Sequence, residues 1–245
     1  MSELHRKTAG PIAVVAAVAV LLAMACSAAA AAPVKTLPRT TMIARIVEPV
    51  AAYAKPGGKH VLRWLSVRAS WAGGPVGLMV TNEAVDAKGR AWLRVQLPGR
   101  PNGHGAWVRR SKVFHYKTPW SIEVRLHTRM VILRKLGRPY RKWRAVIGAP
   151  PTPTPVGLFA VAERDRQPNP GGFYGPWILR LTARSEKLKQ FDGGPGTVGL
   201  HGRGGASLLD PLGSARSHGC VRLSNDAIAR ITAVAREGTP VLIKR

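Results

Sequence analysis

Residues 217–222 read Ser-His-Gly-Cys-Val-Arg, and a His-Gly pair precedes them at residues 201–202. A thiol must ionise before it attacks a carbonyl carbon, and a nearby imidazole can take its proton. His201 and His218 both flank Cys220, and an extended segment would point His218 and Cys220 to one face. The glycines let backbone approach a substrate, so the amides of Gly219 and Cys220 are candidate oxyanion donors. These residues predict a cysteine nucleophile and leave the choice of base open.

Two other interpretations of this cysteine compete with catalysis. A lone cysteine is most often a small buried hydrophobic residue, and cysteine with histidine can also bind zinc. Only three such ligands are present, with no acidic fourth at tight spacing, so the sequence disfavours a metal site and implies no cofactor. Residue chemistry alone leaves a catalytic thiol and an inert one as equal alternatives.

The segment that contains the motif is predicted to be mainly β with one helix. Residues 121–126 alternate strictly between polar and apolar side chains, which is typical of a strand. Residues 225–236 place Ile228 and Ile231 on one helical face, and Ser224 or Asn225 can cap the start. Further strands are predicted at residues 130–133, 143–147, 157–161, 178–181 and 241–243.

Together the two motifs resemble the signature of the L,D-transpeptidase catalytic domain. Residues 152–159 resemble the Thr-Pro-x-Gly-x-Phe segment of that family, and residues 174–177 resemble its Tyr-Gly-Pro segment. Residues 121–126 resemble its opening strand, so the similarity spans nearly all of residues 119–245. The resemblance implies a β-rich sandwich with one helix near the cysteine.

The same resemblance implies roles for individual residues. Cys220 matches the nucleophile and His201 the general base, with the Gly202 carbonyl orienting that histidine. His218 and Gly219 match the residues that frame the oxyanion region.

Four more residues match positions around the site. Ser217 and Arg222 match motif positions that shape the site, and binding of a substrate carboxylate by Arg222 is an equal alternative. Tyr174 and Trp177 fall in the region that covers the donor channel, although for Trp177 we expect core packing.

The implied activity is that of a peptidoglycan L,D-transpeptidase, an acyltransferase with a cysteine nucleophile. Cys220 would attack a stem tetrapeptide, release the terminal D-alanine, and pass the acyl group to another stem in a 3→3 crosslink. Attack by water would make the same site an L,D-carboxypeptidase, and the resemblance implies acylation of Cys220 by carbapenems. A wall-binding protein with an idle thiol and a zinc-binding domain are the alternatives.

A smaller β domain is predicted ahead of the catalytic one, over residues 42–116. Strands are expected at 43–47, 64–67 and 91–97, separated by turns rich in glycine and proline. The tryptophan-bearing strand at 91–97, followed by Gly-Ala-Trp-Val at 105–108, resembles the end of a bacterial SH3-like domain. We therefore expect a small SH3-like barrel.

The first 32 residues have the layout of an export signal. A short basic start is followed by an uncharged apolar run over residues 12–25 and by small residues up to Ala32. A poor lipoprotein box at residues 22–26, cleavage among 28–32 and an uncut membrane anchor are all open, and 33–41 is a predicted linker. We expect the folded part to lie outside the cytoplasm, in the cell envelope, with any membrane contact made only by this segment.

The net charge of the chain indicates which class of binding partner to expect. Lys and Arg number 38 against 12 Asp and Glu, a formal net charge of +26. Such an excess favours an anionic partner, and export disfavours nucleic acid. We expect anionic cell-wall polymers as a background attraction, beside the peptidoglycan stem peptides that the resemblance implies.

Overall fold

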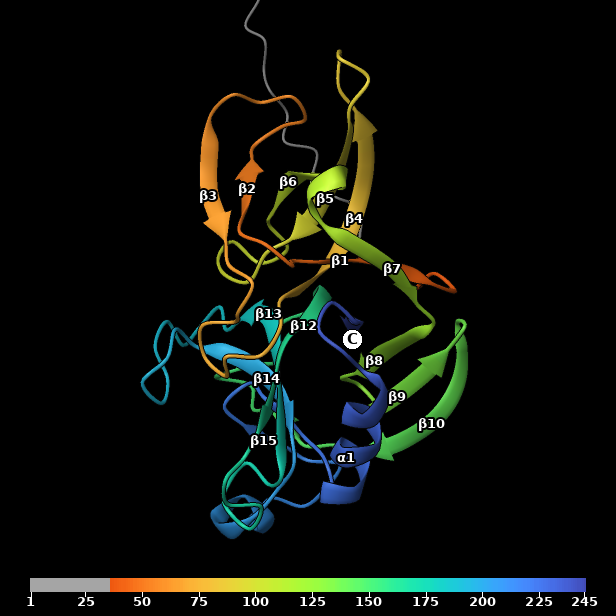
Figure 1. Ribbon diagram of the computed structural model, residues 1–245. Helices are drawn as coiled ribbons and strands as arrows, with labels where there is room; N and C mark the ends of the chain where they lie inside the picture. The colour runs from red at the N-terminus through yellow and green to blue at the C-terminus, as the bar shows by residue number, and fades with distance from the viewer. Residues whose placement is uncertain (1–35) are drawn as a thin grey trace, which may run out of the picture. The chain divides into compact units, whose positions relative to one another are not determined.

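The computed structural model describes residues 36–245, so the predicted export signal lies outside the described residues. The described residues form one compact unit, which contains two large β-sheets. Figure 1 shows the ribbon, with strands in both sheets and one α-helix labelled. The prediction of a mainly β fold is confirmed.

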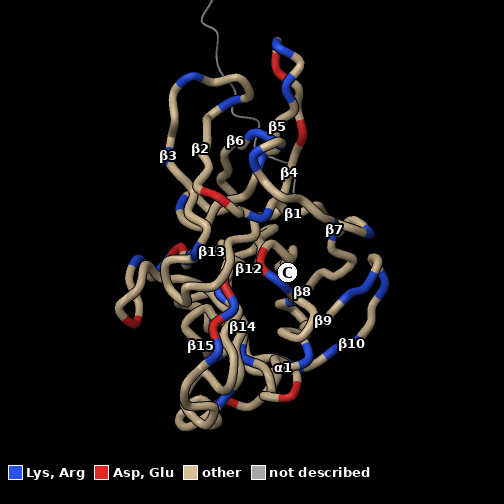
Figure 2. Tube along the Cα trace, in the orientation of Figure 1, with Lys and Arg blue, Asp and Glu red and all other residues tan. Residues whose placement is uncertain are grey.

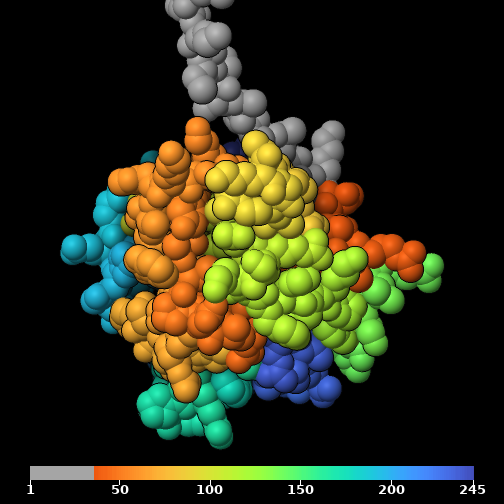
Figure 3. All heavy atoms as spheres, turned by 45° about the horizontal axis from the view of Figure 1, so that its top comes forward, coloured from red at the N-terminus to blue at the C-terminus, as the bar shows by residue number. Residues whose placement is uncertain are grey.

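The first sheet has seven strands in the order β3-β2-β6-β5-β4-β1-β7. The alternation of buried and more exposed side chains is clearest in β5, where Leu93 and Val95 are fully buried in one cluster with Val108 of β6. The outer surface of this part of the chain is the orange to yellow-green region in Figure 3. The strands are β1 (Thr41–Arg45), β2 (Val50–Tyr53), β3 (Val61–Leu65), β4 (Gly77–Val85), β5 (Ala91–Gln96), β6 (Gly105–Arg109) and β7 (Phe114–Thr118).

The predicted strands at 43–47, 64–67 and 91–97 correspond to β1, β3 and β5, shifted by up to three residues. Strand β4 was not predicted from the sequence, because its second half reads Thr-Asn-Glu-Ala-Val and is largely exposed. Strand β7 pairs with β1 and runs to Thr118, two residues past the predicted end of the first domain. An SH3-like identity for this sheet stays a prediction.

The second sheet has eight strands in the order β10-β9-β8-β17-β12-β13-β14-β16. A separate short pair joins β11 (Ile147–Gly148) to β15 (Ala215–Ser217). The remaining elements are β8 (Trp120–Arg125), β9 (Met130–Lys135), β10 (Arg138–Arg144), β12 (Gly157–Arg166), β13 (Trp177–Arg184), β14 (Thr197–His201), β16 (Val221–Arg222), α1 (Asn225–Val234), β17 (Pro240–Lys244) and the 3-10 turns η1 (Arg110–Lys112) and η2 (Gly205–Leu209).

One predicted strand, at residues 143–147, is wrong in extent. The chain turns at Gly137, where φ is +77°, and β10 returns along β9 to end at Arg144. Ala145 then leaves the sheet, and its amide bonds to the Arg129 carbonyl. The apolar residues 145–147 are buried because they enter the core as a crossing segment, which a short apolar run does not distinguish from a strand.

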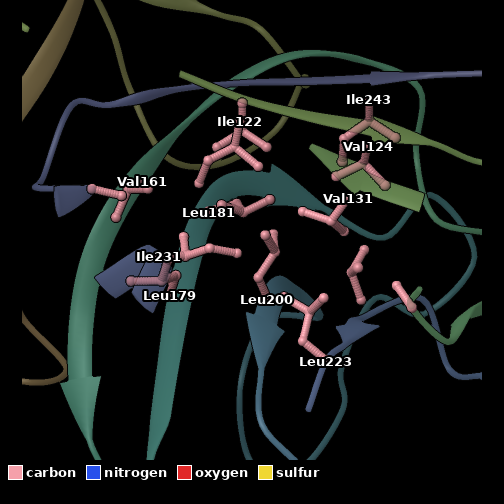
Figure 4. Packing of buried hydrophobic residues seen from close by; sticks show 14 of the residues in the cluster. Ile122, Val124, Val131, Val161, Leu179, Leu181, Leu200, Leu223, Ile231 and Ile243 are labelled. Atoms are coloured by element: carbon pink, nitrogen blue, oxygen red, sulfur yellow. The ribbon is translucent and has the colours of Figure 1, made fainter. Parts of the chain in front are cut away.

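The core of the second sheet collects side chains from strands far apart in the sequence. Figure 4 shows Leu179, Leu181 and Leu200 pointing toward Ile231 and Leu223. Each of these five side chains is fully buried. The packing fixes β13, β14 and α1 relative to one another, and these elements carry or border the candidate site.

The helix α1 forms as predicted, although it ends at Val234 rather than at residue 236. The Ser224 hydroxyl accepts a hydrogen bond from the Ala227 amide at 3.2 Å and caps the start. Ile228 and Ile231 are fully buried on the face that packs against β13 and β14.

Charge is spread along the chain, as Figure 2 shows for Lys and Arg over both sheets. Few acidic residues interrupt it. Within residues 36–245 no helix is long and apolar enough to cross a membrane.

Candidate active site

The two motifs meet as neighbouring strands. Strand β14 ends at His201, β16 begins directly after Cys220, and the two pair in parallel with Leu200 opposite Val221. His201 and Cys220 both line a cavity of about 50 Å³. The pairing brings together residues that lie 19 positions apart in the sequence.

His201 is held in one tautomer by its own turn. Its ring Nδ1 lies 2.7 Å from the Gly202 carbonyl oxygen, which can only accept, so Nδ1 carries the proton and Nε2 has the free lone pair. The side chain is 1% exposed. Burial, with the positive charges of Arg222 and Arg180, lowers the pKa of His201 to about 4, against the opposing bond to Gly202. The imidazole is therefore neutral at pH 7 and able to accept a proton.

The Cys220 thiol is the second ionisable group of the site. Burial raises the pKa of its thiol, while a hydrogen bond from the Gly199 backbone and the charges of Arg222 and Arg180 act in the opposite direction. The Sγ atom lies 4.0 Å from the Thr197 carbonyl oxygen. The resting state pairs a protonated thiol with a neutral imidazole, so proton transfer has to accompany attack.

Close backbone packing at Gly202 fixes the histidine turn. A Cβ at Gly202 would lie 2.4 Å from Asn225 Oδ1, and one at Gly175 would lie 2.5 Å from the same atom. Asn225 Oδ1 accepts the Arg203 amide at 2.7 Å. The sequence indicated Asn225 only as a candidate helix cap, so its support of the His-Gly turn was not predicted.

The cysteine motif is a turn and not an extended segment. Gly219 has a φ of +112°, a backbone conformation that favours glycine. His218 is exposed, and its ring centroid lies 5.2 Å from that of Phe191. The expectation that His218 and Cys220 share one face assumed an extended segment, which this turn replaces.

Ser217 ties the turn together. Its hydroxyl donates to the Cys220 carbonyl at 2.5 Å and accepts the Gly219 amide at 3.1 Å. Of the two backbone amides predicted as oxyanion donors, that of Gly219 is therefore already hydrogen-bonded within the motif. The Cys220 amide is the remaining candidate.

The Thr-Pro segment buttresses the motif from the other side. Thr154 Oγ1 donates to the Gly219 carbonyl at 2.9 Å and accepts the Gly148 amide at 2.9 Å. Thr152 Oγ1 donates to the Ser217 carbonyl at 3.4 Å. These bonds connect the turn that holds Cys220 to the loop before β12 and to β11 of the short two-stranded sheet.

Arg222 is 4% exposed and does not line the cavity. Its guanidinium forms an ion pair with Asp210 and lies 4.9 Å from the centre of the Phe173 ring. These contacts favour the alternative in which Arg222 shapes the site over the one in which it binds a substrate carboxylate.

Tyr174 lines the cavity, with its ring edge-on to His201 at a centroid distance of 5.0 Å. Its hydroxyl donates to Asp192 Oδ2 at 2.5 Å, and burial together with this bond raises the pKa of the phenol. Trp177 packs against the core of the second sheet, which agrees with the packing role expected for it.

Several cavity residues were not found from the sequence. Trp71 comes from the loop between β3 and β4, and Phe191 and Asp192 come from the loop between β13 and β14. Arg180 lies in the predicted strand 178–181, where alternation with Leu179 and Leu181 was a usable signal. Among residues 36–245 no group of three or more His, Cys, Asp and Glu side chains is placed to hold a metal ion.

A neutral buried histidine and a partly buried thiol therefore line one cavity, and both groups are of the kind used in acyl transfer to cysteine. The family model of the L,D-transpeptidase catalytic domain (YkuD) matches residues 119–243, more than half of the chain. The chain belongs to this family, and its catalytic domain is that of a peptidoglycan transpeptidase.

Two curated proteins and a solved structure are similar to parts of the chain. The chain is 25% identical over 180 residues to the YkuD protein of Bacillus subtilis, covering 74% of this chain and 92% of that one. It is 30% identical over 125 residues to YkuD of Bacillus licheniformis, covering 51% and 66%. A solved L,D-transpeptidase of Enterococcus faecium matches with a TM-score of 0.38 at 23% identity, covering 51% of this chain and 49% of that one. The chain thus spans most of the first relative and about half of the solved one.

Proposed function

We propose that this protein is an exported L,D-transpeptidase that forms 3→3 crosslinks in peptidoglycan through a Cys220 acyl-enzyme. The observation that carries the proposal is that His201 ends β14, Cys220 directly precedes the neighbouring strand β16, and both line one cavity, in a chain of this family. Cys220 is the nucleophile and His201 the general base. Gly202 orients His201, and Ser217 and Gly219 hold the turn that presents the thiol.

In the first half-reaction the thiol proton moves to His201 Nε2 as Sγ bonds to the carbonyl carbon of the third stem residue. The Cys220 amide stabilises the oxyanion that forms. The carbon–nitrogen bond to the terminal D-alanine then breaks, and His201 returns the proton to the departing amine. The products are a thioester on Cys220 and free D-alanine.

In the second half-reaction the side-chain amine of another stem attacks the thioester. His201 takes the amine proton, and the Cys220 thiol is restored as the new amide forms. Attack by water in the same step would release a tripeptide and make the enzyme an L,D-carboxypeptidase.

The rest of the chain supports this role. We propose two domains, an SH3-like one over residues 42–116 and the catalytic one over 119–245, after the linker 33–41. Residues 1–32 direct export and make the only membrane contact. The excess of basic residues attracts the protein to anionic wall polymers.

The test incubates the purified chain with a disaccharide-tetrapeptide and reads the products by mass spectrometry. We expect a crosslinked dimer with loss of D-alanine, absent in Cys220→Ala and retained in the control variant His127→Asn, which changes an exposed histidine outside the two motifs. Tripeptide alone would assign carboxypeptidase activity. Crosslinking by Cys220→Ala, or no product from folded wild-type protein, would overturn the proposal.

A further inference from the structure

A basic side chain outside the Cys-His pair also faces the cavity. In the second sheet Arg180 of β13 lies opposite Gly199 of β14 on one side and Glu163 of β12 on the other. Gly199 in turn neighbours Cys220 across the β14–β16 pair. Arg180 is therefore two strand spacings from the nucleophile, roughly 10 Å between backbones, and the residue between them has no side chain.

The contacts of Arg180 hold its guanidinium in place without using all its donors. Nη2 donates to Asp165 Oδ2 at 2.9 Å, and the guanidinium carbon lies 4.4 Å from the centre of the Trp71 ring. Nε is buried and has no hydrogen-bond partner among residues 36–245. A guanidinium has five N–H donors in a fixed plane, so a group suited to paired acceptors is presented to the cavity.

Apart from Asp165, the acidic side chains near Arg180 accept hydrogen bonds from other residues. Glu163 Oε2 accepts the Ala72 amide at 2.7 Å, and Asp192 Oδ2 accepts the Tyr174 hydroxyl. The side chain of Arg180 is only 20% exposed, which strengthens an interaction with an anion there. Trp71 belongs to the first sheet's β3–β4 loop, so the first sheet helps to position this arginine.

We propose that Arg180, positioned by Trp71 and Asp165, binds a carboxylate of the donor stem peptide and selects donors that carry it. The inference rests on the function proposed above. Two carboxylates are candidates, the terminal one of the departing residue and the side-chain one of the diamino acid. Both offer the planar pair of acceptor oxygens that a guanidinium matches.

The experiment compares three tetrapeptide donors, one unmodified, one with an amidated terminal carboxylate, and one with an amidated diamino-acid carboxylate. Release of the terminal residue gives kcat/KM for the wild type, Arg180→Gln and Arg180→Lys. Affinities of the same peptides are also measured by calorimetry in a Cys220→Ala background, with and without Arg180→Gln. Arg166→Gln, which removes an exposed charge from neighbouring β12, is the matched control.

We expect the wild type to use one amidated donor roughly 10- to 100-fold less efficiently than the unmodified peptide. Arg180→Gln should use that amidated donor and the unmodified peptide about equally. Arg180→Lys should retain part of the preference for the unmodified peptide, and Arg166→Gln should retain all of it. The amide that loses efficiency identifies the carboxylate. The same preference should appear in the binding measurements.

Other outcomes would overturn the inference. Arg180 also lowers the pKa of Cys220 by its charge, and an effect of that kind alone would slow all three donors by one factor. A wild type that does not discriminate, or an unchanged preference in Arg180→Gln, would exclude carboxylate binding. Preserved binding preference with no turnover of any donor would instead contradict the proposed function and leave Arg180 as the carboxylate ligand.

Discussion

The cavity above Cys220 has two walls that are built in different ways. One wall consists of strand residues, Arg180 from β13 and Thr197, Gly199 and His201 from β14. Their backbones are held by the antiparallel ladder between these strands. The other wall consists of loop residues, Trp71, Tyr174, Phe191 and Asp192.

The loop wall depends on a few side-chain contacts. These are the hydrogen bond from Tyr174 to Asp192, the stacking of Trp71 on Arg180 and that of Phe191 on His218. We expect the strand wall to hold the reacting atoms more rigidly than the loop wall holds its side chains.

The largest expected effect comes from replacing His201, the general base in the strand wall. His201→Gln removes the proton acceptor, and the rate of acylation of Cys220 by a carbapenem should fall by roughly 10²- to 10⁴-fold. Whole-protein mass spectrometry over time measures that rate. His127→Gln, a change at an exposed histidine outside the two motifs, should alter it by about 3-fold at most. Similar losses in the two variants would contradict the assignment of His201 as base.

The buried histidine also predicts how stability depends on pH. The pKa of His201 is about 4 in the folded protein against 6.5 for the free side chain, so protons bind the unfolded chain more tightly. Its contribution is fully present above pH 6.5, declines as the pH falls toward 4, and is lost below it. The linked loss is about 3 kcal/mol by the conversion of pKa into free energy.

Urea unfolding at pH 7, 5 and 4 measures this loss. Carboxylates with lowered pKa values, such as Glu123, also lose stability in acid, so the comparison is with His201→Gln at each pH. The gap in unfolding free energy between wild type and variant should shrink as the pH falls. A gap that stays constant would mean that His201 keeps an ordinary pKa when folded.

A smaller effect tests how tightly the strand wall is packed. Gly202→Ala would put a Cβ 2.4 Å from Asn225 Oδ1, and the clash should lower the unfolding free energy by about 1–3 kcal/mol. Gly74→Ala is the matched control, because nothing lies within 4 Å of its added Cβ. Equal Tm values for the two variants would show that the His-Gly turn relaxes without cost.

The sequence predicts the strand wall only in part. The strand 178–181, the helix after Ser224 and the pair of motifs at 201–202 and 217–222 were all found from alternation, periodicity and residue chemistry. Local patterns identify such elements because their side chains are sorted by one face of burial. Strand β14 was missed, since Thr-Val-Gly-Leu-His is short and carries a glycine that lowers its strand signal.

Apart from Tyr174, the residues of the loop wall were not predicted, and the reason is different. Trp71 reaches the cavity only because the loop that carries it contacts the second sheet, where the Ala72 amide bonds to Glu163. This contact joins residues 91 positions apart and leaves no periodic pattern. The orientation of His218 was also missed, because the positive φ at Gly219 is a property of the folded turn.

The smallest expected effect loosens the loop wall alone. Asp192→Asn weakens the bond that Tyr174 donates, a contact between partly exposed groups, so the loop should open more often by a factor of roughly 5. Alkylation of Cys220 by a bulky maleimide should then speed up by about that factor relative to alkylation by iodoacetamide. The ratio of the two rates cancels any change in the thiol pKa, since both reagents need the thiolate. Asp226→Asn removes an exposed charge that pairs with Arg230 on α1, and it should leave the ratio unchanged. An unchanged ratio in Asp192→Asn would place the barrier to entry at Trp71 and the first sheet.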